Sequence, residues 1–445
     1  MLRTLAALLA FAATPALADL TAEEVLADHL NLLSGYGLID MSTTGTTERP
    51  DGLTVDGFIG KYQDENTRVE ILTPGMMLTE NPDGSVQIDY ADTLAVTINA
   101  KPIGKEANSA TLTLKTTGLT HVVSGSPGDI QHDIAFDTLT LGEFTLQPPA
   151  ALDEMNLSAD FAIAGFASTI RLADTAPVRR SLDLDIAGLS FASTMLLPAE
   201  IGIDTPGSSY DAVGNGETDV TFTLSDLSTR IGYLGRELPR HSMSTTLGHI
   251  RWDQTVTMDG DEGDIEMTLG GQQLALSYDV EFDFAKLEDD ILKALASGQN
   301  MSAALNFQSL DYDFEIDTPE GTFASVTSSG ASENRFSISE NGLLVFSETA
   351  ASVFDMGGPD LGLPINSFGY SIGHTLIDFA MPIAPSEAPQ PFRFRVALED
   401  VATDDSIWNL FDPTGRIERA PAHLSFDLDG TTVLKFPYHR EVEDS

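Results

Sequence analysis

The sequence of 445 residues contains no cysteine. Without thiols, the chain can form neither a disulfide framework nor a cysteine-ligated metal site, and it has no residue to carry the lipid of a lipoprotein. We therefore expect a hydrophobic core to hold the fold, and a chain of this length with 42% hydrophobic residues can supply one.

Basic residues are also scarce. The 23 lysines and arginines face 68 acidic residues, which gives a formal net charge of −45. Such a field repels phosphate backbones and anionic lipid head groups, so nucleic acid is excluded as an expected partner. Cations, basic protein patches and uncharged apolar molecules are the classes of partner that this charge leaves open.

Long hydrophobic runs are missing except at the N-terminus, where Leu5 to Ala13 is apolar throughout. Arg3 precedes this run and Ala16-Leu17-Ala18 follows it, as in a signal peptide with its small-x-small cleavage site. The sequence predicts cleavage after Ala18 and a periplasmic protein with no transmembrane segment, with an uncleaved anchor as the alternative.

Motifs of known chemistry are few. No glycine-rich loop opens a helix after a strand, and the eight histidines never occur at H-x-H or H-x-x-x-H spacing. Gly369 to Gly373 matches the G-x-S-x-G motif of hydrolases around Ser371, and His423 and His439 follow in the order that a triad needs. However, the alternation around Ser371 predicts a strand and not the strand-to-helix turn that such a serine occupies.

Carboxylates cluster at two places. Asp259 to Asp264 is rich in acidic residues and glycine, but its spacing does not fit an EF-hand, and a hairpin turn explains it without calcium. Asp311, Asp313 and Glu315 alternate with apolar residues, which predicts the solvated face of a strand. We therefore assign no catalytic, cofactor-binding or metal-binding residue and expect no cofactor.

Alternation with period two dominates the rest of the chain. Its clearest example is Leu274 to Phe284, where one side of the predicted strand is apolar and the other carries Ser277, Asp279, Glu281 and Asp283. This pattern is typical of an antiparallel sheet that is covered on one side, with a dry face and a wet one.

The alternation slips by one residue at several places, and a bulge or sharp bend must restore the inward direction at each slip. The slips lie at Ile186 to Leu189, Leu224 to Leu227, Phe307 to Leu310, and Leu398 to Val401. Because bulges bend strands, we predict a mainly β fold of one or more large, strongly curved antiparallel sheets. The sheet forms either an open groove or half-barrel, or a closed sandwich or barrel in which the slips are corners.

Three helices are predicted. Ala22 to Ser34 follows a capping box of Thr21 and Glu24. Lys286 to Ala296 carries leucines at helical spacing. Asp404 to Leu410 is predicted with Thr403 as its N-cap and with Ile407, Trp408 and Phe411 pointing inward, Trp408 as a core anchor.

The predicted organisation is a signal peptide at 1–18 followed by two curved-sheet regions, 19–210 and 211–445. The boundary lies within the Gly- and Ser-rich segment Asp204 to Thr218. One continuous domain is the alternative.

Three stretches resemble a family of uncharacterised exported bacterial proteins known only as a domain of unknown function. They are LTAEEVLADHLNLLSGYG from Leu20, VEFDFAKLEDDILKALASGQ from Val280, and RFRVALEDVATDDSIWNLFDPTGRIERAPAHLSFDLDG from Arg393. The segment from Trp408 to Pro413 is the most specific part. The resemblance implies an envelope protein with a large curved β-sheet, and it brings no catalytic residues.

The leading functional hypothesis is a periplasmic protein that shelters an apolar ligand, such as a lipid, in its curved sheet. One alternative is a structural or assembly factor that contacts envelope proteins without a ligand. A second alternative is a hydrolase.

Overall fold

The computed structural model describes residues 20–34, 40–63, 67–102, 108–147, 158–174, 178–197, 216–235, 239–258, 264–281, 299–318, 321–359, 365–383, 388–417, 419 and 422–433. The predicted signal peptide at 1–18 and the predicted helix at 286–296 lie outside these residues, as do the turn at 259–263, His439 and most of the segment around residue 210.

The fold is mainly β, as predicted. The described strands form an antiparallel sheet of 23 strands, and two helices accompany them. The chain divides into two compact units, Met1–Pro198 and Ala199–Ser445, which we describe one at a time.

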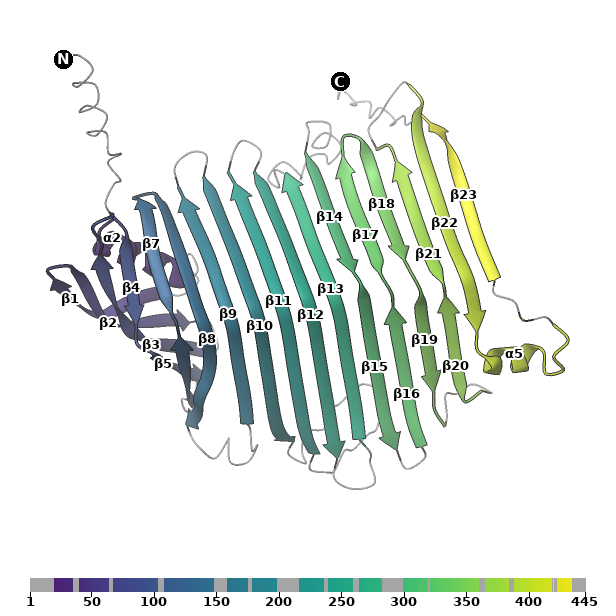
Figure 1. The fold of residues 1–445 in the computed structure, drawn as a ribbon, viewed down its shortest axis with the longest axis horizontal. Helices are drawn as coiled ribbons and strands as arrows, with labels where there is room; N and C mark the ends of the chain where they lie inside the picture. Colours follow the sequence, from purple (N-terminus) through teal and green to yellow (C-terminus); the bar gives the residue numbers. More distant parts are fainter. Residues whose placement is uncertain are drawn as a thin grey trace, which may run out of the picture. The chain divides into compact units, whose positions relative to one another are not determined.

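Unit 1 contains helix α2 and ten strands (Figure 1). Their bounds are α2 Ala22–Leu33, β1 Asp40–Arg49, β2 Gly52–Gln63, β3 Thr67–Glu80, β4 Val86–Tyr90, β5 Thr93–Pro102, β6 Asn108–Thr117, β7 Thr120–Ser126, β8 Asp129–Gln147, β9 Ser158–Ala173 and β10 Arg179–Leu197.

Helix α2 begins as the sequence predicts. The Thr21 hydroxyl accepts a hydrogen bond from the Glu24 amide, and the Glu24 carboxylate accepts one from the Thr21 amide, so the capping box is confirmed. Val25 and Leu26 on its inner side are buried against strands of the unit.

This packing makes a sealed hydrophobic core in unit 1. The core residues from the helix and five strands are Leu20, Ala22, Val25, Leu26, Leu53, Val55, Phe58, Met76, Leu78, Val86, Ile88, Val123 and Ile130. Close backbone approach within it requires a glycine at position 75, because a Cβ there would lie 1.9 Å from the Val55 carbonyl oxygen.

Unit 2 contains thirteen described strands and helix α5. Their bounds are β11 Gly216–Leu234, β12 Arg240–Met258, β13 Asp264–Glu281, β14 Asn300–Phe307, β15 Ser309–Thr318, β16 Gly321–Ser329, β17 Ser332–Ser339, β18 Gly342–Thr349, β19 Ser352–Gly357, β20 Ser367–Ile372, β21 His374–Met381, β22 Gln390–Thr403, α5 Asp405–Phe411 and β23 Ala422–Thr432.

A line of irregularities crosses the middle of this sheet, and we call it the seam. Between β13 and β22 the strands are split at the seam into an upper row, β14, β17, β18 and β21, and a lower row, β15, β16, β19 and β20. The long strands β13 and β22 pair with the upper row along one half and with the lower row along the other, as Figure 1 shows.

The seam confirms the predicted slips. Pairing of β11 with β12 is interrupted between Ser225 and Ser228, where Asp226 has a φ of 54°. The register of β22 with β23 shifts between Leu398 and Val401, where Asp400 has a φ of 54°. The slip at Phe307 to Leu310 is the break between β14 and β15.

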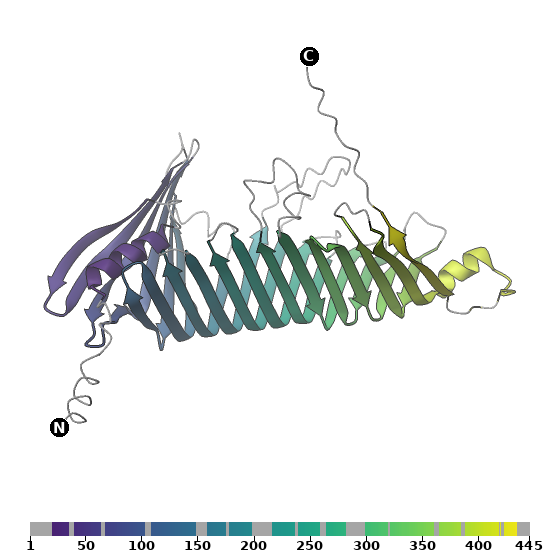
Figure 2. The same cartoon turned by 90° about the horizontal axis from the view of Figure 1, so that it is seen from above.

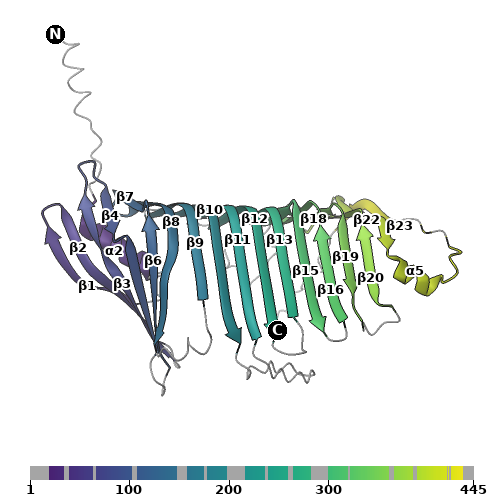
Figure 3. The ribbon, with the colours of Figure 1, turned by 60° about the horizontal axis from the view of Figure 1, so that its bottom comes forward.

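The same kind of irregularity occurs in unit 1, where Gly165 of β9 has a φ of 61° opposite the slip at Ile186 to Leu189. In unit 2 the strand halves on the two sides of the seam are inclined to each other, as seen in Figure 2. The strands still lie side by side from β11 to β23 (Figure 3). The predicted curvature is therefore a bend repeated strand by strand.

The C-terminal helix differs from its prediction in two respects. Asp404, and not Thr403, is the N-cap, because its carboxylate accepts the Ile407 amide 3.2 Å away while Thr403 still belongs to β22. Phe411 does not point inward but is 74% exposed, and Trp408 is half-buried.

Candidate functional site

The main candidate site is one face of the unit 2 sheet, which we call the apolar face. Residues that pair across antiparallel strands project on the same side of a sheet. One row of such pairs crosses the whole unit above the seam and consists of Ile231, Met243, Tyr278, Ala303, Phe336, Val345, Phe379, Phe394 and Leu428.

The adjacent row projects on the opposite side and is polar or charged at most positions. It consists of Arg230, Ser244, Ser277, Ala304, Arg335, Phe346, Asp378, Arg395 and Asp427. Ion pairs join neighbouring strands on this side, for example Arg393 with Asp378 and Arg395 with Asp429. The two faces thus differ sharply in chemistry.

Below the seam the apolar face continues with Phe222, Trp252, Leu269, Tyr312, Thr327, Phe354 and Tyr370 in one row of pairs. The two halves meet at Gly271, where a Cβ would lie 3.0 Å from Leu274 above the seam and 3.1 Å from Ile250 below it. The bend therefore preserves one continuous apolar face, because apolar side chains from both halves lie on the same side.

The described residues leave this face accessible. Leu276 and Leu305, which pair at its centre, are each 42% exposed, and Phe426 near its edge is 51% exposed. The large buried hydrophobic side chains of the described chain all lie in unit 1. On the strand from Leu274, whose apolar side was expected to be dry, Leu276 is therefore exposed, while Leu274, Tyr278 and Val280 are half-buried.

Charge is confined to the other side. By the register of the described strands of unit 2, no aspartate, glutamate, lysine or arginine takes a position on the apolar face. Asp311, Asp313 and Glu315 of β15 are exposed on the polar side, which confirms the solvated face predicted for them. The apolar face can therefore bind the apolar surface of a partner, but it offers that partner no ion pair with aspartate, glutamate, lysine or arginine.

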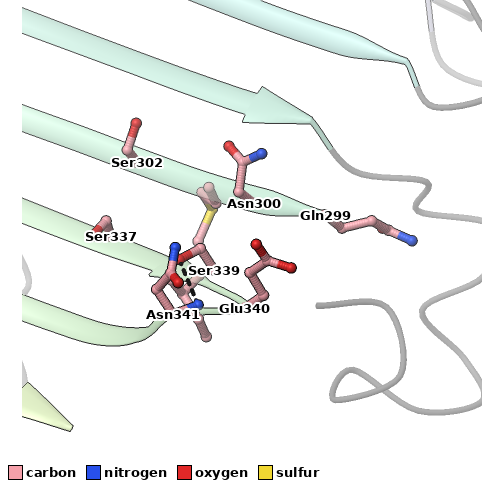
Figure 4. A pocket seen from close by; sticks show the side chains of 9 residues that line it. Gln299, Asn300, Ser302, Ser337, Ser339, Glu340 and Asn341 are labelled. Carbon is pink, nitrogen blue, oxygen red and sulfur yellow. Dashed lines mark hydrogen bonds between the residues drawn. The ribbon is translucent and has the colours of Figure 1, made fainter. Parts of the chain in front are cut away.

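A small pocket lies where β14 begins and β17 ends. Its volume is about 290 Å³, and polar side chains of Asn300, Ser339, Glu340 and Asn341 gather around it (Figure 4). Met301, a residue of the apolar face, contributes to its lining. By the register, Ser302 and Ser337 of its lining project on the polar side, so the pocket is mainly a feature of that side.

A second candidate is a chain of buried polar side chains in unit 1. Tyr90 Oη lies 3.0 Å from His121 Nδ1, His121 Nε2 lies 3.0 Å from His132 Nδ1, and His132 Nε2 lies 2.7 Å from Asp28 Oδ2. His29 packs beside this chain, with its ring centroid 6.0 Å from that of His121. The chain joins α2 to strands β4, β7 and β8.

Burial controls the ionisation of this chain. Desolvation lowers the pKa of His121 to about 3 and that of His29 to about 4, with a further lowering from the nearby His132 in both cases. Desolvation also raises the pKa of Tyr90. The tyrosine is thus held neutral and unsuited to act as a nucleophile, although it lines an open hollow of about 630 Å³.

Sequence spacing could not find this cluster, because its members come from four separate elements. A weaker signal was present: His121 and His132 each stand two residues from an inward apolar residue, Val123 and Ile130, at positions where the alternation calls for another apolar side chain. The described residues contain no group of three or more acidic or histidine side chains that is suited to hold a metal ion.

The sequence motifs take ordinary structural places. Ser371 lies within strand β20 and pairs with Val353 and Ala402, on the polar side of the sheet. His423 lies on β23 beside Asp400, with 3.7 Å between its Nε2 and the carboxylate. The predicted hairpin around Asp259 to Asp264 is confirmed by the pairing of Val256 with Ile265.

Comparison with known proteins identifies no relative: no family model, no curated protein and no solved structure matches the chain. In the part of the chain that the structure describes, no helix is long and apolar enough to cross a membrane.

Proposed function

We propose that this protein binds acyl chains of lipids along the apolar face of unit 2. The observation that carries the proposal is a face without aspartate, glutamate, lysine or arginine in the described strands, on which many apolar side chains are more than a third exposed. Exposed apolar surface of this kind marks a site where an apolar partner binds, because its burial is favourable at about 25 cal/mol per Å².

The size of the face favours several acyl chains over one small molecule. Eight successive pairings join β11 to β23 through the upper row, which spans about 38 Å at a strand spacing of about 4.8 Å. An acyl chain occupies about 15 Å, half of a hydrocarbon core of about 30 Å. The face is therefore long enough for a row of chains.

The charge distribution indicates which lipids fit. Without lysine or arginine on the apolar face, the protein offers no counter-charge to a head group of net negative charge, and its own net charge of −45 repels such a head group. In a zwitterionic head group the ammonium balances the phosphate, so no counter-charge from the protein is needed. We propose phospholipids with zwitterionic head groups as the ligand class.

The predicted location is part of the same proposal: the protein acts in the periplasm after cleavage behind Ala18. The periplasm is aqueous, so acyl chains in it must be shielded from water by a protein surface. The intact mass of the protein purified from its native cells tests this directly, since cleavage leaves a chain that starts at Asp19.

The binding proposal is tested by placing a charge on the apolar face. Leu276→Lys and Leu305→Lys introduce an ammonium at positions that are each 42% exposed, so the folded protein tolerates it in water. A lipid lying over the same position must desolvate that charge, which costs several kcal/mol. We expect extraction of fluorescent phosphatidylcholine from phosphatidylcholine vesicles to fall at least tenfold.

Val326→Lys is the matched control. Val326 is also 42% exposed but lies on the polar side, between Asp313 and Asp355. This variant should extract lipid as the unchanged protein does. Equal extraction by all three variants, or no extraction by the unchanged protein, would contradict the proposal and leave protein contacts as the alternative use of the face.

A further inference from the structure

The buried chain of unit 1 ties the N-terminal helix to the sheet through histidines. Asp28 and His29 come from α2, Tyr90 from β4, His121 from β7 and His132 from β8. His132 is fully buried and His121 is 2% exposed. Disrupting this cluster would therefore loosen the contact between the helix and three strands.

The hydrogen bonds of the chain run in one direction. The Asp28 carboxylate accepts only, so His132 donates to it from Nε2 and its Nδ1 accepts from His121 Nε2. The remaining nitrogen, His121 Nδ1, then accepts from the Tyr90 hydroxyl. With both rings neutral, every donor in the chain has an acceptor.

One added proton breaks this balance. A doubly protonated ring has two N–H donors, and even if the chain reverses at Tyr90, one N–H or O–H is left without an acceptor within it. His29 adds to the conflict, because its buried Nδ1 has no hydrogen-bond partner and its ring is enclosed by Phe58, Tyr90 and His121. A proton on His29 or His121 therefore has no carboxylate to pair with, because the carboxylate of Asp28 is already bonded to His132 Nε2 at 2.7 Å.

The neighbours of the cluster supply little compensation. The charged groups that act on His29 and His121 are Asp28 and the other histidines of the cluster, and β2 contributes the ring of Phe58. Asp89, Asp92 and Lys115 lie with Tyr90 around the open hollow. Glu80 of β3 contacts the far end of α2, where it accepts the Ala22 amide at 2.8 Å. Within the described part of the chain, Asp28 is the only carboxylate hydrogen-bonded to one of these rings, and its partner is His132.

We propose that protonation of this histidine cluster releases α2 from the sheet of unit 1, so that the helix is docked at neutral pH and detaches in acid. Once detached, the rings reach water and titrate near their ordinary value of about 6.5, whereas burial keeps the pKa of His29 and His121 well below it. Detachment therefore takes up protons. The ratio of detached to docked α2 rises by up to about tenfold per pH unit of acidification for each histidine, or about 100-fold for two.

The test measures the distance between helix and sheet. Because the chain has no cysteine, Ala27→Cys on α2 and Thr120→Cys on β7 give two unique sites for spin labels, and both positions are exposed. In the full chain we expect one narrow distance distribution at pH 7.5. It should broaden and lengthen as the pH falls from 6.5 to 4.5, while the far-ultraviolet signal of the strands stays constant.

A double variant separates the histidines from other acid effects. Gln at position 121 still donates to His132 and accepts from Tyr90 without titrating, and Leu at position 29 fills the enclosed site. His29→Leu combined with His121→Gln should therefore keep the narrow distance at pH 4.5. His241→Gln in unit 2 should behave as the unchanged protein.

Three outcomes would overturn the proposal. The distance could stay narrow down to pH 4, the strand signal could disappear in step with the distance, or the double variant could detach at the same pH as the unchanged protein. If the double variant fails to fold at pH 7.5, the paired distance and strand measurements on the unchanged protein still decide the question.

Discussion

A pair of leucine truncations tests whether the two units bury their apolar side chains differently. Leu78 in unit 1 is 0% exposed and pairs with Leu53 and Ile88 in the sealed core. Leu78→Ala should cost about 2–5 kcal/mol, because it loses buried methyl groups and leaves a cavity. Leu305 in unit 2 is 42% exposed. Leu305→Ala should cost only about 1 kcal/mol. A little over half of the leucine side chain is buried, so only that part of its transfer free energy is lost, and no enclosed cavity is left behind.

The measurement is urea-dependent hydrogen exchange resolved by peptide, which follows strands β2–β4 and β13–β14 separately. The fluorescence of Trp252 and Trp408, the only tryptophans in the chain, reports on unit 2 in parallel. We expect a large loss of protection in unit 1 for Leu78→Ala and a small loss in unit 2 for Leu305→Ala. Equal losses would refute the reasoning, because they would mean that the apolar face is covered as tightly as a core.

Three further predictions concern unit 1 and the bend of unit 2. The pKa values of His29 and His121 in the folded protein lie below their unfolded value, so the unfolded state binds more protons below pH 6.5. The free energy of unfolding of unit 1 should therefore fall as the pH drops from 6.5 toward 4, by up to about 2 kcal/mol at pH 5 for each histidine. Calorimetric melts across that pH range measure this loss. Gly75→Ala should destabilise unit 1 by about 3 kcal/mol or more because its Cβ would collide with a backbone carbonyl, whereas Gly270→Ala, with no atom within 4 Å, should leave urea midpoints nearly unchanged. Thr21→Ala removes the N-cap of α2 and should cost about 1 kcal/mol, seen as faster amide exchange in the first helical turn.

The sequence predicted the bends of the sheet because each one leaves a mark in the alternation. Leu224 and Leu227, or Leu398 and Val401, keep the same face only if the backbone between them departs from regular strand geometry. Asp226 and Asp400 provide this departure with positive φ angles. The same logic predicted α2, since a capping box is a local pattern that tertiary contacts did not override.

The exposure of the apolar face could not be predicted in the same way. Alternation indicates that Leu276 and Leu305 share a face, but it does not say whether another layer covers that face. The histidine cluster was hidden for a related reason. His29, His121 and His132 meet only after α2 packs across strands that are distant in sequence, and no local spacing records that contact.

The C-terminal helix shows a third limit. Thr403 and Asp404 are both good N-cap residues, so the sequence alone did not decide which of them caps the helix. Because β22 continues to Thr403, the N-cap is Asp404. Phe411 looked like an inward residue because of its size, yet no described element packs over it.

The most direct test of the central claim is native mass spectrometry of the protein purified from its own cells without detergent. Because the apolar face is about 38 Å long, we expect more than one phospholipid per protein molecule, released by organic extraction. The Leu276→Lys variant should carry at least tenfold less lipid. A lipid-free mass for the unchanged protein, with no uptake from phosphatidylcholine vesicles, would contradict the account.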